Sequence, residues 1–289
     1  MLRSIALSVA LALTGCATMD SETIGAPRKE TIYAVTDDNR LLSFNGGQPQ
    51  KTLRSTALTG LQPGETLHGI DYRVARGVLF GLGSSGRLYT INTQTGAVTA
   101  VGGPIPVKLA GNEVGFDFNP TVDRIRVVTD SGQNLRLHPD TGAMVDSDPK
   151  TDGLQIDGGL AYADGDANAG KPARLMAAGY TYNKTNAKIT TNFAIDGGMG
   201  LLVTQGTRED VNPAVSPNTG RLYTVGALCT GPVARAALDI SDLDNSAYAA
   251  LTASGAKTSV LYLVNLANGS AQRIGSIAGG PVRGIAIEP

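Results

Sequence analysis

The chain has 289 residues, with 24 Lys and Arg against 25 Asp and Glu, and a formal net charge of −1 at pH 7. This balance, without any long block of like charge, argues against nucleic-acid binding driven by bulk electrostatics. The 37 glycines, the absence of Trp and a charged fraction of only 17% are typical of an all-β domain rich in turns. No helical periodicity is sustained past residue 15, and the length suffices for one domain with a substantial core.

The first fifteen residues predict an export signal. Arg3 is followed by an apolar run over residues 5–13, which is too short to serve as a stable membrane span. The run ends in Leu-Thr-Gly-Cys, which resembles the bacterial lipobox and predicts cleavage and lipidation at Cys16. Ala17 then indicates outer-membrane sorting, so we expect a lipid anchor in the bacterial cell envelope on the periplasmic side. Residues 16–29 are polar and unpatterned, which predicts a flexible tether before a domain over residues 30–289.

The most informative stretch is 68–103, which contains four short apolar runs separated by Gly- and Asn-rich turns. The runs cover residues 69–72, 78–82, 88–91 and 97–101. Such runs, rich in β-branched and aromatic residues, predict four antiparallel strands in one small sheet. A sheet of this size is not stable alone, so it must stack on copies of itself.

Copies of the first run recur along the chain and predict a β-propeller. The Gly-Ile-Asp-Tyr of residues 69–72 is echoed at 115–118, 159–162, 237–240 and 284–287. Four-stranded repeats at this spacing indicate propeller blades. The last copy is a single strand, which we expect to complete a blade with the runs at 31–35 and 40–44. We therefore predict five four-stranded blades with one long blade over residues 159–229; a six-blade alternative would begin an extra blade at Asn212.

Several phrases resemble a bacterial family known as domain-of-unknown-function family 4394, over roughly residues 30–289. The phrases are GFDFNPTVDRIRVV at 115–128, GQNLR at 132–136, DANAG at 166–170, AGYT at 178–181 and VRGIA at 282–286. The resemblance implies an exported, propeller-like domain. It implies no reaction, substrate or catalytic residue.

The densest polar cluster suggests a site for an anion. Period-two alternation places Arg124 and Arg126 on one face of a strand, and Asn134, Arg136 and His138 on one face of the next. Arginines flanked by amides suit a carboxylate, a phosphate or a sugar acid, so we predict ligand-binding roles for Arg124, Arg126, Asn134 and Arg136. The alternative is that the arginines pair with Asp117, Asp123 and Asp130 and join neighbouring blades.

Asp71, Asp117 and Asp239 occupy one position of three first strands, which line the channel of a propeller. Carboxylates that converge on an axis suit a cation such as calcium, so the three residues are candidate metal ligands. Equally, each could accept backbone N–H bonds from its neighbour. The loop at 164–170 matches a calcium loop weakly, and His68, near one mouth of the channel, is a candidate general base whose alternative role is structural.

Three functions remain open. The absence of a G-x-S-x-G motif, of a zinc spacing and of a phosphate-binding glycine loop favours a non-enzymatic propeller that binds a protein or a small anionic ligand. The second is a lactonase-like hydrolase or lyase with a channel-bound cation. The third is a purely structural envelope protein. We expect Cys229 to be a small, buried or half-buried loop residue without a catalytic role. We expect no intrachain disulfide, because lipid consumes Cys16.

Overall fold

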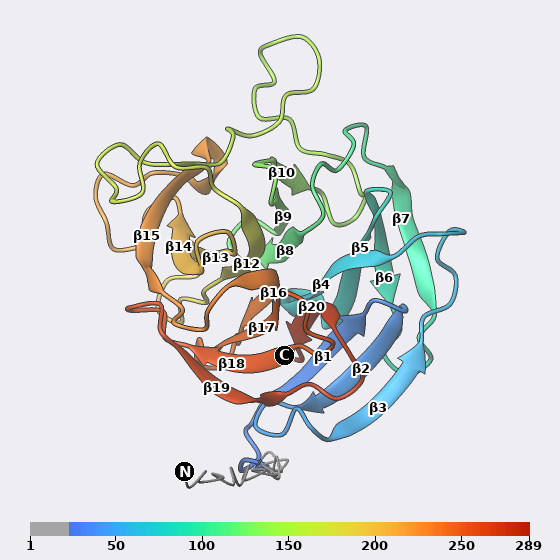
Figure 1. Cartoon of the computed structure of the whole chain (residues 1–289). Coiled ribbons are helices and arrows are strands. Elements are labelled where there is room, and N and C mark those ends of the chain that lie inside the picture. The colour runs from blue at the N-terminus through green and yellow to red at the C-terminus, as the bar shows by residue number, and fades with distance from the viewer. Residues whose placement is uncertain (1–22) are drawn as a thin grey trace, which may run out of the picture.

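The computed structural model describes residues 23–289, which form five β-sheets around one axis. The chain passes once around this ring, as the colours from blue to red in Figure 1 show. Five blades are therefore confirmed, and the segment at residue 212 begins no additional sheet.

Blade 1 joins the two ends of the described chain. Its strands, from the axis outward, are β20 (Val282–Ile287), β1 (Thr31–Thr36), β2 (Arg40–Asn45) and β3 (Thr52–Ala57). Ala34 on β1 lies opposite Ile285 on β20, in an antiparallel ladder. This is the expected closure by the C-terminal strand, and it leaves no inner edge of the ring open.

Blade 2 follows the predicted four-strand unit closely. Its strands are β4 (Leu67–Arg73), β5 (Val78–Gly83), β6 (Arg87–Ile91) and β7 (Val98–Pro104), with a 3₁₀ turn η1 (Val74–Arg76) between the first two. Blade 5 has the same order in β16 (Val233–Ile240), β17 (Ala247–Ala253), β18 (Val260–Val264) and β19 (Ala271–Ser276).

Blades 3 and 4 depart from four strands in opposite directions. Blade 3 holds only β8 (Val114–Asn119), β9 (Arg124–Thr129) and β10 (Asn134–Leu137), with a single bridge from Leu137 to Met144 where a fourth strand would lie. Blade 4 holds five strands, which from the axis outward are β12 (Leu175–Tyr180), β13 (Asn192–Asp196), β14 (Leu201–Gln205), β15 (Arg221–Ala227) and β11 (Ala161–Tyr162), with the 3₁₀ turn η2 (Pro217–Thr219) before β15.

The predicted extent of blade 4, residues 159–229, agrees with a sheet that spans residues 161–227, but the inner strand predicted at 159–162 was wrong. Residues 161–162 form the two-residue strand β11 (Ala161–Tyr162), which pairs in parallel with β15 at the outer edge of the sheet. The inner strand is β12, whose Ala-Ala-Gly-Tyr over 177–180 lacks both the Gly and the Asp of the repeat. Residues 159–162 match the repeated motif better than residues 177–180 do. Even so, β12 and not residues 159–162 forms the strand at the axis.

The five inner strands β4, β8, β12, β16 and β20 each contact the next around the axis, and β20 contacts β4. Glycines allow this close approach. A Cβ added at Gly115 would lie 2.6 Å from the backbone carbon of Ala177, and one at Gly69 would lie 2.6 Å from Cβ of Phe116. The glycine of the repeated motif is thus a packing requirement between blades.

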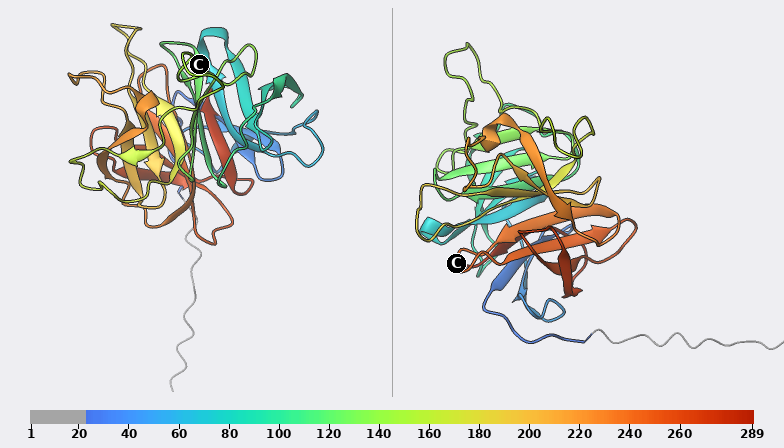
Figure 2. Two further views of the ribbon diagram at one scale, coloured as in Figure 1. Left: turned by 90° about the horizontal axis from the view of Figure 1, so that it is seen from above. Right: turned by 90° about the vertical axis from the view of Figure 1, so that its left-hand side faces the viewer.

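The core consists of apolar layers between adjacent sheets, such as the layer that holds Phe80, Phe116 and Phe118 between blades 2 and 3. The side views in Figure 2 show that the strands of each sheet extend from one end of the propeller to the other. The five inner strands end at residues 73, 119, 180, 240 and 287, and we call this end of the propeller the exit face. The loop over 145–160 projects from the ring at the top of Figure 1.

Candidate functional site

Arg126 and Arg136 lie directly opposite each other on the paired strands β9 and β10. Like charges at opposed positions of an antiparallel pair repel each other, so this register requires a compensating anion. Arg126 is 2% exposed, which makes an uncompensated charge there costly.

Asp157 supplies that anion from the loop after β10. Its Oδ2 lies 2.6 Å from Nη1 of Arg126, and its Oδ1 lies 2.7 Å from Nη2 of Arg136. Nε of Arg136 donates to the same carboxylate at 2.8 Å. The Asp157 side chain is 1% exposed, so one buried carboxylate bridges two guanidinium groups.

Neutral partners complete the bonding of Arg126. Nη2 donates to Oδ1 of Asn218 at 2.6 Å, Nη1 donates to Oδ1 of Asn134 at 2.7 Å, and Nε donates to the hydroxyl of Tyr180 at 3.3 Å. Asn134 is fully buried and donates to the carbonyls of Gly158 and Pro217. Asn134, one of the four predicted ligand-binding residues, therefore fixes the position of the Arg126 side chain.

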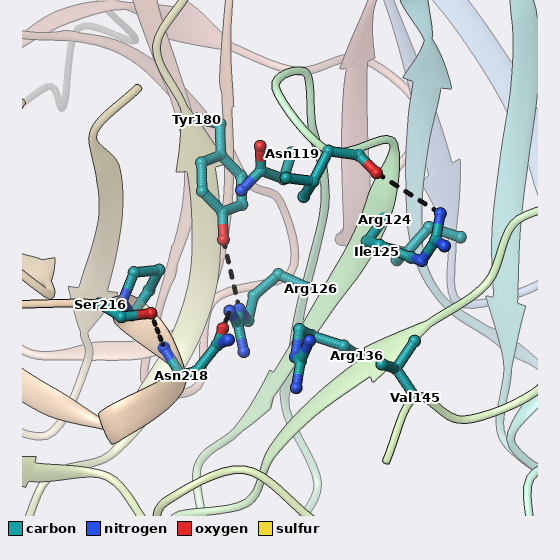
Figure 3. Close-up of a pocket in the computed structure, with 11 residues that line it drawn as sticks. Asn119, Arg124, Ile125, Arg126, Arg136, Val145, Tyr180, Ser216 and Asn218 are labelled. Carbon is teal, nitrogen blue, oxygen red and sulfur yellow. Dashed lines mark hydrogen bonds between the residues drawn. The ribbon is translucent and has the colours of Figure 1, made fainter. Parts of the chain in front are cut away.

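The other three predicted residues line a cavity of about 370 Å³ at the exit face, shown in Figure 3. Blade 3 contributes most of the wall, and β12 and η2 contribute the rest. The lining residues are Asn119, Val122, Arg124, Ile125, Arg126, Arg136, Val145, Tyr180, Ser216, Pro217 and Asn218. This volume falls in the range of small-molecule sites.

The cavity is rich in hydrogen-bond donors. Nη1 of Arg124 donates to the carbonyls of Val122 and Asp123, which leaves its Nε and Nη2 without a bond in the described part of the chain. Nη1 of Arg136 is also without a bond among residues 23–289, since Asp157 takes only Nε and Nη2. With three guanidinium groups and one bridging carboxylate, the site carries excess positive charge.

The predicted alternative partners of the arginines make other contacts. Asp117 of β8 lies opposite Arg126, but its carboxylate accepts a hydrogen bond from the backbone of Tyr180. Asp123 pairs with Arg73 of blade 2, and Asp140 pairs with the same guanidinium. Asp130 lies 3.5 Å from Arg174 and accepts backbone N–H bonds from Asn112 and Glu113. The residue missed by the sequence reasoning is Asp157, which lies in an irregular loop without a strand pattern to give its position.

The three aspartates of the inner strands converge as predicted. Asp71, Asp117 and Asp239 are buried, and one carboxylate oxygen from each lies within 4.8 Å of the others. Each also accepts a backbone N–H bond from the adjacent inner strand: Asp71 from Phe118 at 2.7 Å, Asp117 from Tyr180 at 3.0 Å and Asp239 from Ile287 at 2.5 Å. The structural alternative is thus present in the contacts, and calcium binding stays a prediction.

Burial, together with mutual repulsion, disfavours the charged forms of this trio. Burial and the charge of Asp239 raise the pKa of Asp71 well above its usual value, and burial and the charge of Asp71 do the same for the pKa of Asp117. Burial raises the pKa of Asp239 to about 7. Burial and then the charges of the three carboxylates raise the pKa of the Tyr182 phenol.

The two histidines lie apart from both clusters. Burial and then the charges of Arg283 and Arg235 lower the pKa of His68, and its Nδ1 has no partner among residues 23–289. His138 accepts a hydrogen bond on Nδ1 from the backbone of Asp140 in a turn. Neither histidine lines the arginine cavity.

The loop at 164–170 is held by its own polar bonds. Asp166 accepts from the backbone and hydroxyl of Thr224, and Asn168 donates to the same hydroxyl. The carboxylates of this loop make no metal-ligand cluster in the described region. The expected burial of Cys229 was wrong, because this residue is an exposed free thiol in a left-handed turn at φ 58°.

The predicted signal peptide and Cys16 lie outside the described residues. Of the predicted tether, Gly25 and Arg28 bond to blade 1, through Gln48 and Asn45. Across residues 23–289 there is no helix of the length and apolar character that a bilayer crossing requires.

The ring of blades and its closure by β20 define a five-bladed β-propeller. More particularly, the chain belongs to the family described as "Domain of unknown function (DUF4394)", whose sequence profile matches residues 27–286. No curated protein matches the chain.

Three solved structures show a weak similarity to the chain, each with a TM-score below 0.5. A protein of unknown function from Bacteroides thetaiotaomicron has a TM-score of 0.44 and 15% identity, over 86% of this chain and 58% of that one. The glutaminyl cyclase of Myxococcus xanthus has a TM-score of 0.44 and 11% identity, over 76% of this chain and 89% of the enzyme. A chain of a mitotic checkpoint complex reaches 0.36 with 10% identity, over 86% and 61%. Similarity at these scores carries no argument about the fold or the function of this chain.

Proposed function

We propose that this protein is a lipid-anchored binding module of the bacterial cell envelope, which holds a small anionic ligand in the cavity between β9, β10 and η2. The observation that carries the proposal is the imbalance of charge in a cavity of ligand size. Arg124, Arg126 and Arg136 line it, and the single carboxylate of Asp157 compensates two of them.

The side chains of Asn119, Asn218 and Tyr180 each have a hydrogen-bond donor without an acceptor among the described residues, which supports a ligand rich in acceptors. Oδ1 of Asn119 accepts from the backbone and hydroxyl of Thr121, so its Nδ2 is the group left to donate. Oδ1 of Asn218 accepts from Arg126, which likewise leaves Nδ2. Tyr180 accepts from Arg126 at its oxygen, and no described residue accepts its proton. A carboxylate, a phosphate or a sugar acid offers the acceptors that these donors require.

Calorimetry on the purified full-length chain tests this function with glucuronate, succinate and inorganic phosphate. Glucose is the matched neutral probe for glucuronate. We expect at least one anion to bind and glucose not to bind. Arg124→Gln should weaken the affinity at least about tenfold, because a hydrogen bond between charged groups contributes roughly 1.5–3 kcal/mol. Arg221→Gln, at an exposed position outside the cavity, is the control.

Two results would contradict the binding function. The first is the absence of binding by every anion, and the second is binding that Arg124→Gln leaves unchanged. The anchor has its own test, because incorporation of labelled fatty acid should disappear in Cys16→Ser. Persistence of the label in that variant would refute lipidation at this cysteine.

A cation-dependent hydrolase or lyase is the second candidate. The specific observation in its favour is the convergence of Asp71, Asp117 and Asp239 within 4.8 Å at the channel. This alternative requires a bound cation, and the response of the protein to calcium decides it.

A further inference from the structure

A second cavity of about 210 Å³ lies beside the arginine cavity on the exit face. Asn119 lines both cavities. The β8–β9 turn, residues 119–124, contributes to the two walls, with Val122 and Arg124 on one cavity and Pro120 and Asp123 on the other. Blade 4 borders both as well, through Tyr180 in the first and Tyr182 in the second.

The second cavity differs from the first in charge. Among residues 23–289, the charged residues that line it are Arg73 and Asp123, which form an ion pair with each other. Nε of Arg73 donates to Oδ1 of Asp123 at 2.9 Å, and Nη1 donates to Asp140 at 2.5 Å. The guanidinium of Arg73 is therefore already compensated, and it does not attract a further anion.

Apart from the shared Asn119, the remaining wall of the second cavity is apolar or aromatic. Val74 and Ala75 come from η1, Phe118 and Pro120 come from the end of β8 and its turn, and Tyr182 closes the side toward blade 4. A neutral, apolar group gains free energy on transfer from water into such a wall, whereas an ionised group does not.

Because a cavity rich in arginine lies beside an apolar cavity, we infer that the ligand is an amphipathic anion. Its acidic group binds at Arg124 and Arg136, and an apolar or aromatic group attached to it enters the cavity lined by Ala75, Pro120 and Tyr182. The inference rests on the proposed function and adds the chemical class of the ligand to it.

The inference is tested by comparing propionate with a series of ω-phenylalkanoates of increasing chain length. Calorimetry on the full-length chain measures each dissociation constant. We expect one or more phenyl acids to bind at least about tenfold more tightly than propionate, since burial of a few methylene equivalents suffices for that factor. Ala75→Trp, which fills the second cavity from an exposed position, should remove this gain and leave the affinity for propionate unchanged.

Arg124→Gln should weaken the short and the phenyl acids by the same factor. Arg76→Gln, next to Ala75 but outside the lining, is the matched control, and thermal melts check that every variant is folded. Binding of propionate without any gain from a phenyl group, or a gain that persists in Ala75→Trp, would overturn the amphipathic class and leave the anion function standing. Failure of every acid and of inorganic phosphate to bind would overturn both.

Discussion

The carboxylate of Asp117 accepts a hydrogen bond from the backbone N–H of Tyr180, at 3.0 Å, across the boundary between blades 3 and 4. Asp71 makes the same bond to Phe118, and Asp239 makes it to Ile287. The corresponding residues of the other two inner strands are Gly179 and Ala286, which have no carboxylate. Three of the five boundaries are thus joined by the same buried contact.

The cost of burying this trio should appear as a dependence of stability on pH. The folded-state pKa of Asp239 is raised to about 7, and the pKa values of Asp71 and Asp117 are also raised, while unfolded aspartates titrate near about 3.9. Between these values the folded state binds more protons than the unfolded state. The contribution of the trio to the free energy of unfolding is therefore greatest below about pH 4 and declines as pH rises toward 7.

Asp117→Asn should remove much of that decline. Only Oδ1 of Asp117 receives a backbone N–H bond, and the amide oxygen of Asn can keep it. Urea unfolding should show Asp117→Asn to be more stable than the wild type by roughly 1–3 kcal/mol at pH 8 and nearly equal to it below about pH 4, where Asp117 is protonated in both the folded and the unfolded state. Asp164→Asn, at an exposed loop position, is the control. An equal slope with pH in wild type and Asp117→Asn would show that the trio does not titrate in this range.

Calcium provides a separate test of the predicted metal site. If the trio binds calcium, millimolar calcium at pH 8 should raise the melting temperature of the wild type, by mass action on the folded state. Chelation should reverse the increase, and Asp117→Asn should not respond. A wild-type melting temperature that calcium leaves unchanged would remove the metal assignment and, with it, the cation-dependent enzyme.

Asp157→Asn should destabilise the protein strongly. The substitution leaves the buried guanidinium of Arg126 opposite Arg136 without an anion, and breaking a buried ion pair costs about 3–5 kcal/mol. Chemical denaturation measures the loss. Asp152→Asn, an exposed position in the same loop, should lie within about 0.5 kcal/mol of the wild type. A loss below about 1 kcal/mol in Asp157→Asn would mean that solvent compensates Arg126.

Gly115→Ala tests the packing of the inner strands. The added Cβ would meet backbone atoms of Ala177 and Ala178 at 2.6 and 2.7 Å, which cannot move aside as a side-chain tip can. We expect a loss of about 1–3 kcal/mol in the free energy of unfolding. Gly103→Ala is the matched variant, because no atom lies within 4 Å of its added Cβ. Equal stability of the two variants would contradict the close approach of blades 3 and 4.

Local pattern in the sequence was sufficient for the class of fold. Short apolar runs, punctuated by Gly and Asn turns, predicted the four strands of blade 2 to within three residues at each end, because strand and turn preferences act over a few residues. The repetition of those runs predicted stacked blades, and the unpaired run at 284–287 predicted closure with residues 31–35. The convergence of Asp71, Asp117 and Asp239 followed from their equivalent positions in three repeats.

Only the tertiary structure decided which segment lies at the axis in blade 4 and which residue compensates the arginines. Residues 159–162 carry the repeat pattern but pair at the outer edge, whereas 177–180 lack it and occupy the centre. Asp157 reaches Arg126 and Arg136 from a loop whose path no periodicity describes. Both outcomes depend on contacts between residues distant in sequence, and such contacts are selected by burial and charge in the assembled ring.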